Sequence, residues 1–274
     1  MHSSSPKAFC AGGDVKQLIL GKHEKGDIAD GLEFFTQEYF SDCLIQEAKK
    51  PVVAWIEGIA MGGGVGLTNG ATLRIATELS SFAMPEVYIG FFPDVGASRF
   101  LSELKDNSGF YLGMSGDRVD ARAALAMGLV DVIVKDSDKQ AILDMLKGFR
   151  FWNDKVKDRK HLLQTLEAKL QVVTVGAIEN ESLLNRLKAL KSAFTEKWQI
   201  VEKDFQKFDF KIMRNAIQSL DNQRRRSIQS QALAYELINN YRARGGTWPH
   251  TFVVEWELAI HMLGASNFSE GVRA

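Results

Sequence analysis

The sequence MGGGVG occupies residues 61–66, and two short segments with carboxylates follow it, MPE at 84–86 and FPD at 92–94. A glycine-rich turn can aim bare backbone N–H groups at an oxygen atom. Apolar side chains flank Glu86, and dehydration of this kind raises the pKa of a carboxylate and suits it to proton transfer. The three segments together predict a site that stabilises an oxyanion and moves a proton or activates water.

The bulk composition bounds the class of protein. The chain has 274 residues, enough for one sizeable core with an attached helical region or for two domains. Lys+Arg and Asp+Glu both total 34, and a net charge of zero argues against a general nucleic-acid surface, although local basic patches are compatible with it. Two cysteines, Cys10 and Cys43, imply no disulfide framework and favour a reducing compartment. The longest apolar runs are too short to span a bilayer.

Strand and helix patterns alternate through the first half of the chain. Short apolar runs predict strands at 7–10, 51–56, 72–77, 81–84 and 129–134. Between them, helical periodicity or turn signals predict helices at 15–20, 28–48, 65–69, 95–104, 108–114 and 120–127. Alternation of this kind indicates an α/β fold with a parallel sheet.

The second half has a different character, because nearly all of it shows helical periodicity. Helices are expected at 141–150, 155–170, 182–194, 208–220, 227–241 and 252–263. We therefore expect an α/β core over residues 1–136 and a helical region over residues 137–274. The run Arg224-Arg225-Arg226 is interpreted as a solvated helix start, with an anion or RNA contact as the less favoured alternative.

The ordered motifs of the first half resemble a known family. KAFCAGGD at 7–14 and GIAMGGGVG at 58–66 are similar to the two oxyanion-hole segments of the crotonase (enoyl-CoA hydratase/isomerase) superfamily. FAMPE at 82–86 followed by IGFFPDVG at 89–96 most resembles the 3-hydroxyisobutyryl-CoA hydrolase branch of that superfamily. Several motifs agree in order, so the resemblance is far more specific than a lone glycine motif.

The end of the chain also resembles that branch, through EWEL at 255–258 and FSEGVRA at 268–274. The resemblance implies an α/β crotonase (ClpP/crotonase-like) fold with a helical C-terminal region. It also implies that the early strands, which precede the first motif in the family, are absent from this chain.

The resemblance assigns roles to two glycines and a glutamate. Gly13 and Gly63 would supply the two backbone N–H groups that hold a thioester oxygen; a tight strand–helix turn needed for packing alone is the alternative. Glu86 would face the thioester, where it attacks to give a mixed anhydride or deprotonates water, and the sequence leaves both routes open. A turn carboxylate that caps a nearby N–H is the alternative for Glu86.

Two further carboxylates belong to the expected site. Asp94 would contact the acyl hydroxyl or the attacking water, although Asp is also a favoured N-cap for the helix expected from Val95, and both roles can coexist. Glu38 matches a substrate-contacting position of the branch, whereas most glutamates on amphipathic helices are solvated. Gly66 stands where hydratases of the superfamily carry a second glutamate paired with the one matching Glu86, so a standard hydratase is not expected.

The activity implied by the resemblance is hydrolysis of a short β-hydroxyacyl-CoA such as 3-hydroxyisobutyryl-CoA, in valine catabolism. CoA would be part of the substrate, with no metal or prosthetic group, and the scattered histidines show no zinc spacing. A mitochondrial homo-oligomer without membrane insertion is expected. Two alternatives stay open: a structural subunit of the mitochondrial ribosomal small subunit, in contact with rRNA and proteins, and an enoyl-CoA isomerase.

Overall fold

The computed structural model describes residues 1–5, 7–18, 28–152, 154–175, 181, 183–185, 187–188 and 226–273. Most of the helix expected at 182–194, the whole of the helix expected at 208–220, and Arg224 and Arg225 lie outside the described residues.

The strands of the described chain form two sheets that are largely parallel. One has the order β1-β3-β5-β6, made of Ala8–Cys10, Ile59–Met61, Ser81–Ala83 and Val119–Asp120, with only β6 antiparallel to its neighbour. The other has the order β2-β4-β7, made of Val53–Ile56, Leu73–Thr77 and Val132–Val134. The predicted α/β class is confirmed. β3 and β6 were not expected, because strands of three and two residues carry too little alternation to be recognised.

Helices cover these sheets. Those that the sequence predicts within the described residues begin and end within about one turn of the expected residues, whereas the short helices at 85–88, 105–107 and 136–138 and the helix at 266–273 were not expected. In the first half they are α2 (Ala29–Gln46), α3 (Gly63–Asn69), η1 (Pro85–Tyr88), α4 (Ala97–Glu103), η2 (Lys105–Asn107), α5 (Ser108–Ser115) and α6 (Ala121–Met127). In the second half they are η3 (Asp136–Asp138), α7 (Lys139–Lys147), α8 (Lys155–Lys169), α11 (Ile228–Arg244), α12 (Trp248–Gly264) and α13 (Ser266–Arg273). Among the described residues, no helix is both long and apolar enough to cross a membrane.

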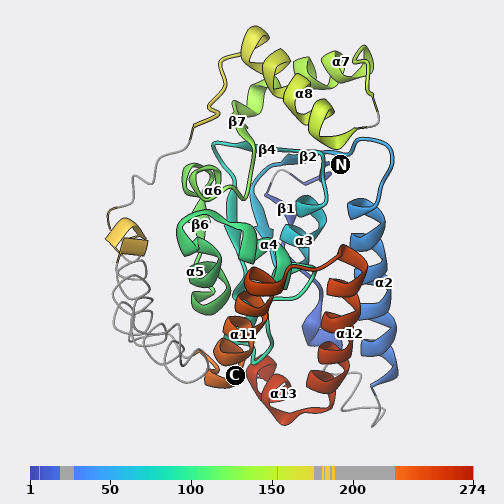
Figure 1. Ribbon diagram of the computed structural model, residues 1–274, viewed down its shortest axis with the longest axis vertical. Coiled ribbons are helices and arrows are strands. Elements are labelled where there is room, and N and C mark those ends of the chain that lie inside the picture. Colours follow the sequence, from blue (N-terminus) through green and yellow to red (C-terminus); the bar gives the residue numbers. More distant parts are fainter. Residues whose placement is uncertain are drawn as a thin grey trace.

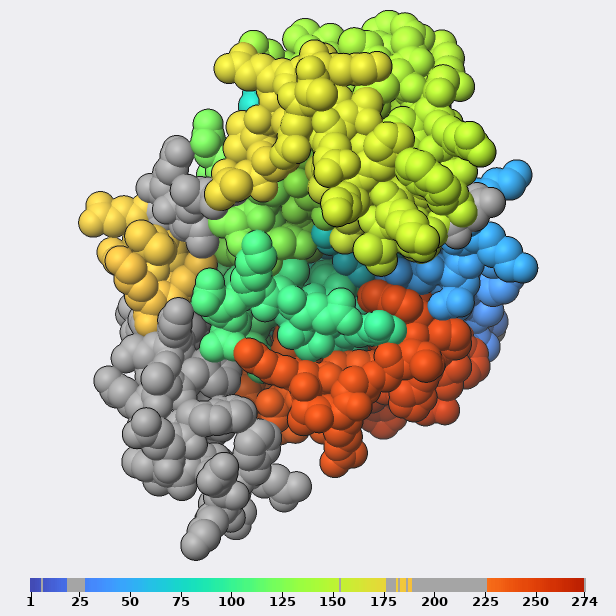
Figure 2. All heavy atoms as spheres, turned by 45° about the horizontal axis from the view of Figure 1, so that its top comes forward, coloured from blue at the N-terminus to red at the C-terminus, as the bar shows by residue number. Residues whose placement is uncertain are grey.

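The helical region divides between two ends of the molecule. Figure 1 shows α7 and α8 above the sheets, and α11, α12 and α13 below, beside α2 and α4. Leu162 and Leu166 of α8 pack with Trp55 and Leu73 of the second sheet in one hydrophobic cluster. The lower helices belong instead to the main core, where Leu263 joins the same cluster as the α/β residues. In Figure 2 the orange-red C-terminal helices lie directly against the green middle of the chain.

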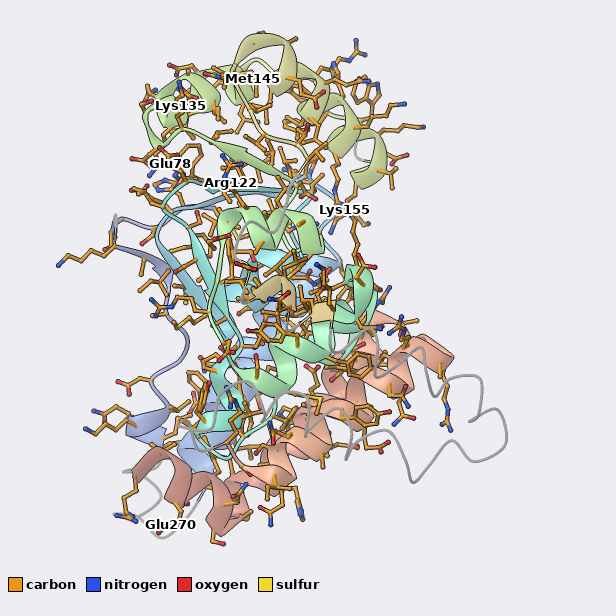
Figure 3. All side chains as sticks on the ribbon, turned by 90° about the vertical axis from the view of Figure 1, so that its left-hand side faces the viewer. Glu78, Arg122, Lys135, Met145, Lys155 and Glu270 are labelled. Atoms are coloured by element: carbon orange, nitrogen blue, oxygen red, sulfur yellow. The ribbon has the colours of Figure 1, made fainter. Side chains whose placement is uncertain are left out.

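The helix α8 is tied to the α/β part by a lysine. The ammonium group of Lys155, labelled in Figure 3, donates to the carbonyl oxygens of Ile45 at 3.2 Å, Gln46 at 2.6 Å and Gly70 at 3.2 Å. Two of these carbonyls lie in the last turn of α2, where a helix leaves its C=O groups without intrahelical partners. A cation at this position is favourable because it meets the negative end of the helix dipole.

Arg226 corrects one expectation from the sequence. Its side chain is only 4% exposed, and its Nη2 lies 3.1 Å from Asp117 Oδ1. Its Nε donates to the carbonyl oxygen of Ser115 at 2.5 Å, and its guanidinium lies 5.2 Å from the ring centre of Tyr88. The prediction of a solvated helix start is therefore wrong for Arg226. The partners are more than a hundred residues earlier in the chain, so no local pattern indicates the pairing.

Candidate active site

All five residues predicted for the site line one cavity of about 240 Å³: Gly13, Glu38, Gly63, Glu86 and Asp94. The remaining walls are mostly apolar, from Phe34, Phe35, Pro85, Tyr88, Ile89 and Phe91 among others. The cavity thus has the composition typical of a small-molecule site, with a few polar groups converging in apolar surroundings.

The glycine turn between β3 and α3 forms one wall of the cavity. Gly62 adopts φ +50°, and its carbonyl oxygen accepts the N–H groups of Val65 at 2.8 Å and Gly66 at 3.2 Å. Gly63 is the first residue of α3, so its own N–H has no acceptor within the helix. A Cβ atom on Gly62 would lie 2.8 Å from Glu86 Oε1, and one on Gly63 would overlap Glu38 Oε1. Glycine at these positions therefore lets two carboxylates approach the turn closely.

There is no room for a side chain at Gly66. A Cβ atom there would lie 2.5 Å from the Cβ of Val95 and 3.0 Å from its carbonyl oxygen. Real Cβ atoms do not approach other heavy atoms so closely, and the backbone of Val95 cannot move aside cheaply. A second carboxylate paired with Glu86 is therefore excluded from this position by packing as well as by sequence.

Glu86 lies on η1, where Pro85 fixes the start of the short helix. Its side chain is 6% exposed, and its Oε2 has no hydrogen-bond partner among the described residues. Burial raises the pKa of this carboxyl well above its ordinary value, and the nearby carboxylate of Asp94 raises it further. A hydrogen bond from its own backbone N–H acts in the opposite direction. Glu86 is therefore suited to hold a proton at neutral pH.

Asp94 is fixed by a tyrosine rather than by a helix. Its Oδ2 accepts a hydrogen bond of 2.5 Å from the hydroxyl of Tyr39 on α2, and its side chain is 5% exposed. Burial raises the pKa of Asp94 to about 7, while the hydrogen bond from Tyr39 acts in the opposite direction. The Asp94 carboxyl therefore has a pKa near neutrality.

The expected N-cap role of Asp94 is wrong. Helix α4 starts at Ala97. Its N-cap residue is Gly96 at φ +85°, which has no side chain that could cap the helix. The carboxylate that caps α4 comes from Glu255 on α12, which accepts from Gly96 N at 2.6 Å, Ser98 N at 2.9 Å and Ser98 Oγ at 2.6 Å. Only the main-chain oxygen of Asp94 meets the helix, at 2.9 Å from Ala97 N. Its carboxylate is thereby left to the cavity.

Helix α2 contributes two carboxyls one turn apart, Glu38 and Asp42. Burial and then Asp94 raise the pKa of Glu38 to about 8. Asp42 is 1% exposed, and neither of its Oδ atoms has a partner among the described residues. Burial, followed by Glu38, Asp94 and Glu255, raises the pKa of Asp42 to about 9. The i,i+4 spacing from Glu38 was the available signal for Asp42; no local signal pointed to Glu255.

Acidic groups without cations give the site its electrostatic character. In the described part of the chain, no ion pair is formed by Glu38, Asp42, Glu86, Asp94 or Glu255. The same part holds no group of three or more side chains placed to bind a metal ion. Carboxyls that cannot all ionise share protons, so one member can accept a proton while another donates. The arrangement fits acid–base chemistry on a neutral electrophile.

Comparisons with known proteins identify the family and the fold of the chain. The family model described as enoyl-CoA hydratase/isomerase matches residues 1–274. The crystal structure of an enoyl-CoA hydratase from Rhodobacter sphaeroides has a TM-score of 0.73 and 28% identity, covering 100% of this chain and 74% of that one. This likeness, together with the parallel sheets, confirms the fold predicted from the motifs.

Two curated relatives differ in what their names describe. The mouse protein "3-hydroxyisobutyryl-CoA hydrolase, mitochondrial" is 32% identical over 271 residues, which is 98% of this chain and 67% of that protein. The "Small ribosomal subunit protein mS47" of Neurospora crassa is 48% identical over 116 residues, 42% of this chain and 23% of that protein. The chain thus spans about two thirds of the length of the mouse relative.

Proposed function

Because the chain belongs to the enoyl-CoA hydratase/isomerase family, we propose that it hydrolyses the thioester of a short β-hydroxyacyl-CoA such as 3-hydroxyisobutyryl-CoA. The observation that carries the proposal is the shared cavity, in which the Gly63 turn lies beside the buried carboxyls of Glu86 and Asp94. The similarity to the mouse hydrolase supports the choice of acyl group. The filled space at Gly66 argues against hydration of a double bond.

The glycine backbone would stabilise the charge that develops on the thioester oxygen. When a nucleophile adds to the carbonyl carbon, the oxygen gains negative charge, and the N–H groups of Gly13 and Gly63 would donate to it. One such donor is typically worth about 2.7–4 kcal/mol in the transition state. The walls of the cavity strengthen this effect, because apolar side chains keep competing water away from the oxygen.

The carboxyls would divide the proton transfers between them. Asp94, whose pKa is about 7, is partly ionised at neutral pH and can accept the proton of an attacking water. Glu86, whose pKa is raised well above its ordinary value by burial, can return a proton to the sulfur as the carbon–sulfur bond breaks. Alternatively, ionised Glu86 attacks the carbonyl carbon, expels the CoA thiolate and forms a mixed anhydride. Water then hydrolyses the anhydride and restores the Glu86 carboxylate, so the products are the same, a hydroxy acid and the free thiol of CoA.

CoA enters as part of the substrate, and the chemistry above uses side chains and backbone alone. A mitochondrial location is supported by the name of the mouse relative. Assembly into a homo-oligomer is proposed from the family resemblance.

Free-thiol release from 3-hydroxyisobutyryl-CoA by the purified chain tests the proposal. Glu86→Gln keeps the shape of the side chain but cannot ionise, so it should abolish release while the protein stays folded. Glu167→Gln is the matched control, because Glu167 is exposed on α8, remote from the cavity lining. The proposal fails if the folded wild type releases no thiol, or if Glu86→Gln retains full activity. An isomerase would move a double bond without thiol release.

A second function, as a structural subunit of a small ribosomal subunit, is favoured by one observation: the 48% identity over 116 residues to mS47. Contact with rRNA requires exposed cations, whereas the ammonium of Lys155, at the start of α8, is bonded to three carbonyl oxygens of the protein itself. Sedimentation of the chain with small ribosomal subunits in high salt would support the second function. A free chain that binds CoA thioesters would count against it.

A further inference from the structure

The backbone that follows Asp94 is strained. Val95 adopts φ +56°, a left-handed conformation that is a genuine outlier for a β-branched residue, and Gly96 follows at φ +85°. Val95 is also 1% exposed, with its side chain against Gly66. Such a conformation persists only where the surrounding structure over-determines it. The chain must therefore contain groups that hold this turn in place.

Glu255 holds the turn from the C-terminal helices. Its Oε2 accepts the N–H of Gly96, directly after Val95, and its Oε1 accepts both the N–H and the hydroxyl of Ser98. The residue is completely buried, and it lies 157 positions from Ser98 in the sequence. Helix α12 brings it there by packing alongside α2 and α4 (Figure 1).

The opposite side of Asp94 is fixed by α2. The Tyr39 hydroxyl donates to Asp94 Oδ2, so one helix holds the carboxylate while another holds the backbone that carries it. The rings of Tyr39 and Phe252 lie 6.2 Å apart, which links α2 to the first turns of α12 in one packed unit. A displacement of Glu255 would therefore be felt at the carboxylate of Asp94.

We infer that Glu255 is a positioning residue for the reaction: it holds the strained turn at Val95 so that the Asp94 carboxylate faces the cavity. The inference rests on the proposed hydrolase function. A helix cap needed for stability alone could come from a local Ser or Asp, as Asp120 does for α6. Glu255 instead adds a further buried carboxyl to those already near Asp94. This is electrostatically unfavourable and is explained by the geometry that Glu255 imposes.

Glu255→Gln tests the inference in the whole 274-residue chain, with Glu257→Gln as the matched control, since Glu257 is exposed on the same helix. Glutamine keeps the size of the side chain but turns an NH₂ group toward one of the N–H donors. We expect kcat for thiol release to fall on the order of 10- to 100-fold, because small displacements of a reacting group have effects of this size. KM should change less than about threefold, and the control should match the wild type.

Retention of full kcat by Glu255→Gln would overturn the inference. This includes the case in which KM rises while kcat is unchanged. If Glu255→Gln fails to fold, Ser98→Ala removes one of the three hydrogen bonds and should give a smaller loss of the same kind. Hydrogen–deuterium exchange of the Gly96 and Ser98 amides provides a readout without substrate. If the wild type lacks hydrolase activity, the proposed function fails. If the Gly96 and Ser98 amides exchange at the same rate in Glu255→Gln as in the wild type, Glu255 does not anchor the turn, whatever the activity.

Discussion

Replacing Asp42 with Asn should remove a large part of the pH dependence of stability. Asp42 is 1% exposed, neither carboxyl oxygen has a partner in the described residues, and its neighbours Glu38, Asp94 and Glu255 are acids. Burial, reinforced by these neighbours, raises the pKa from an ordinary 3.8 to about 9. The folded chain therefore binds one proton more than the unfolded chain over the intervening pH range.

The sign and size of the effect follow from proton linkage. Stability from a carboxyl with a raised pKa is fully present below the unfolded value of 3.8 and is lost as the pH rises toward 9. One extra bound proton corresponds to a loss of about 1.4 kcal/mol for each pH unit. Between about pH 5 and pH 8 this amounts to at most roughly 4 kcal/mol. Asparagine cannot ionise, so it lacks this slope.

The measurement is urea unfolding of the wild type and of Asp42→Asn at a series of pH values. An amide left without hydrogen-bond partners destabilises the variant by about 1–3 kcal/mol at every pH, so the slope and not the offset is diagnostic. Asp30→Asn is the control, because Asp30 is exposed on the same helix. We expect the difference between wild type and Asp42→Asn to change steadily with pH. Parallel curves would refute the reasoning, since they would mean that Asp42 is ionised in the folded chain.

Two further substitutions test the neighbouring groups. Tyr39→Phe removes the hydrogen bond that opposes the rise in the pKa of Asp94. It should move the acidic limb of kcat/KM for thiol release upward by about one pH unit, and an unmoved limb would show that Asp94 does not control it. Gly66→Glu should overlap Val95, lower the free energy of unfolding by at least about 1–3 kcal/mol and confer no hydration of enoyl-CoA. The midpoint of urea unfolding measures the stability of Gly66→Glu, and the absorbance of an enoyl-CoA measures its hydration. A Gly66→Glu variant that is as stable as the wild type and hydrates the enoyl-CoA would contradict the packing argument.

The cavity could be predicted from sequence because its parts carry local signals. The glycine run between β3 and α3 needs a positive φ at Gly62 and a close approach at Gly63, and no other residue type satisfies both. Glu86 follows a proline at the start of η1, which fixes its place relative to β5. These features depend on neighbours within a few residues, so the motif and the geometry coincide.

The supporting residues could not be predicted, because their partners are distant in the sequence. An Asp directly before an expected helix is a strong local N-cap signal, yet Glu255 occupies that role and frees Asp94. Arg226 likewise meets Asp117 across more than a hundred residues. In both cases a tertiary contact overrides a correct local preference, and only the packing of α11 and α12 against the α/β core reveals it.

The cluster of buried acids separates the two candidate functions on physical grounds. A carboxyl such as Asp42 or Glu86, buried without a cation, lowers stability at neutral pH whether it ionises or remains protonated without partners. A subunit that serves only as a scaffold gains nothing from that loss, since apolar side chains of similar volume would pack as well. An enzyme that must deliver and accept protons beside a thioester gains groups whose pKa values are separated by their surroundings. The acids around Asp94 therefore favour the hydrolase. The strained backbone at Val95, which carries Asp94 into this cluster, is the physical reason why three hydrogen bonds to Glu255 of α12 are needed to hold the turn in place.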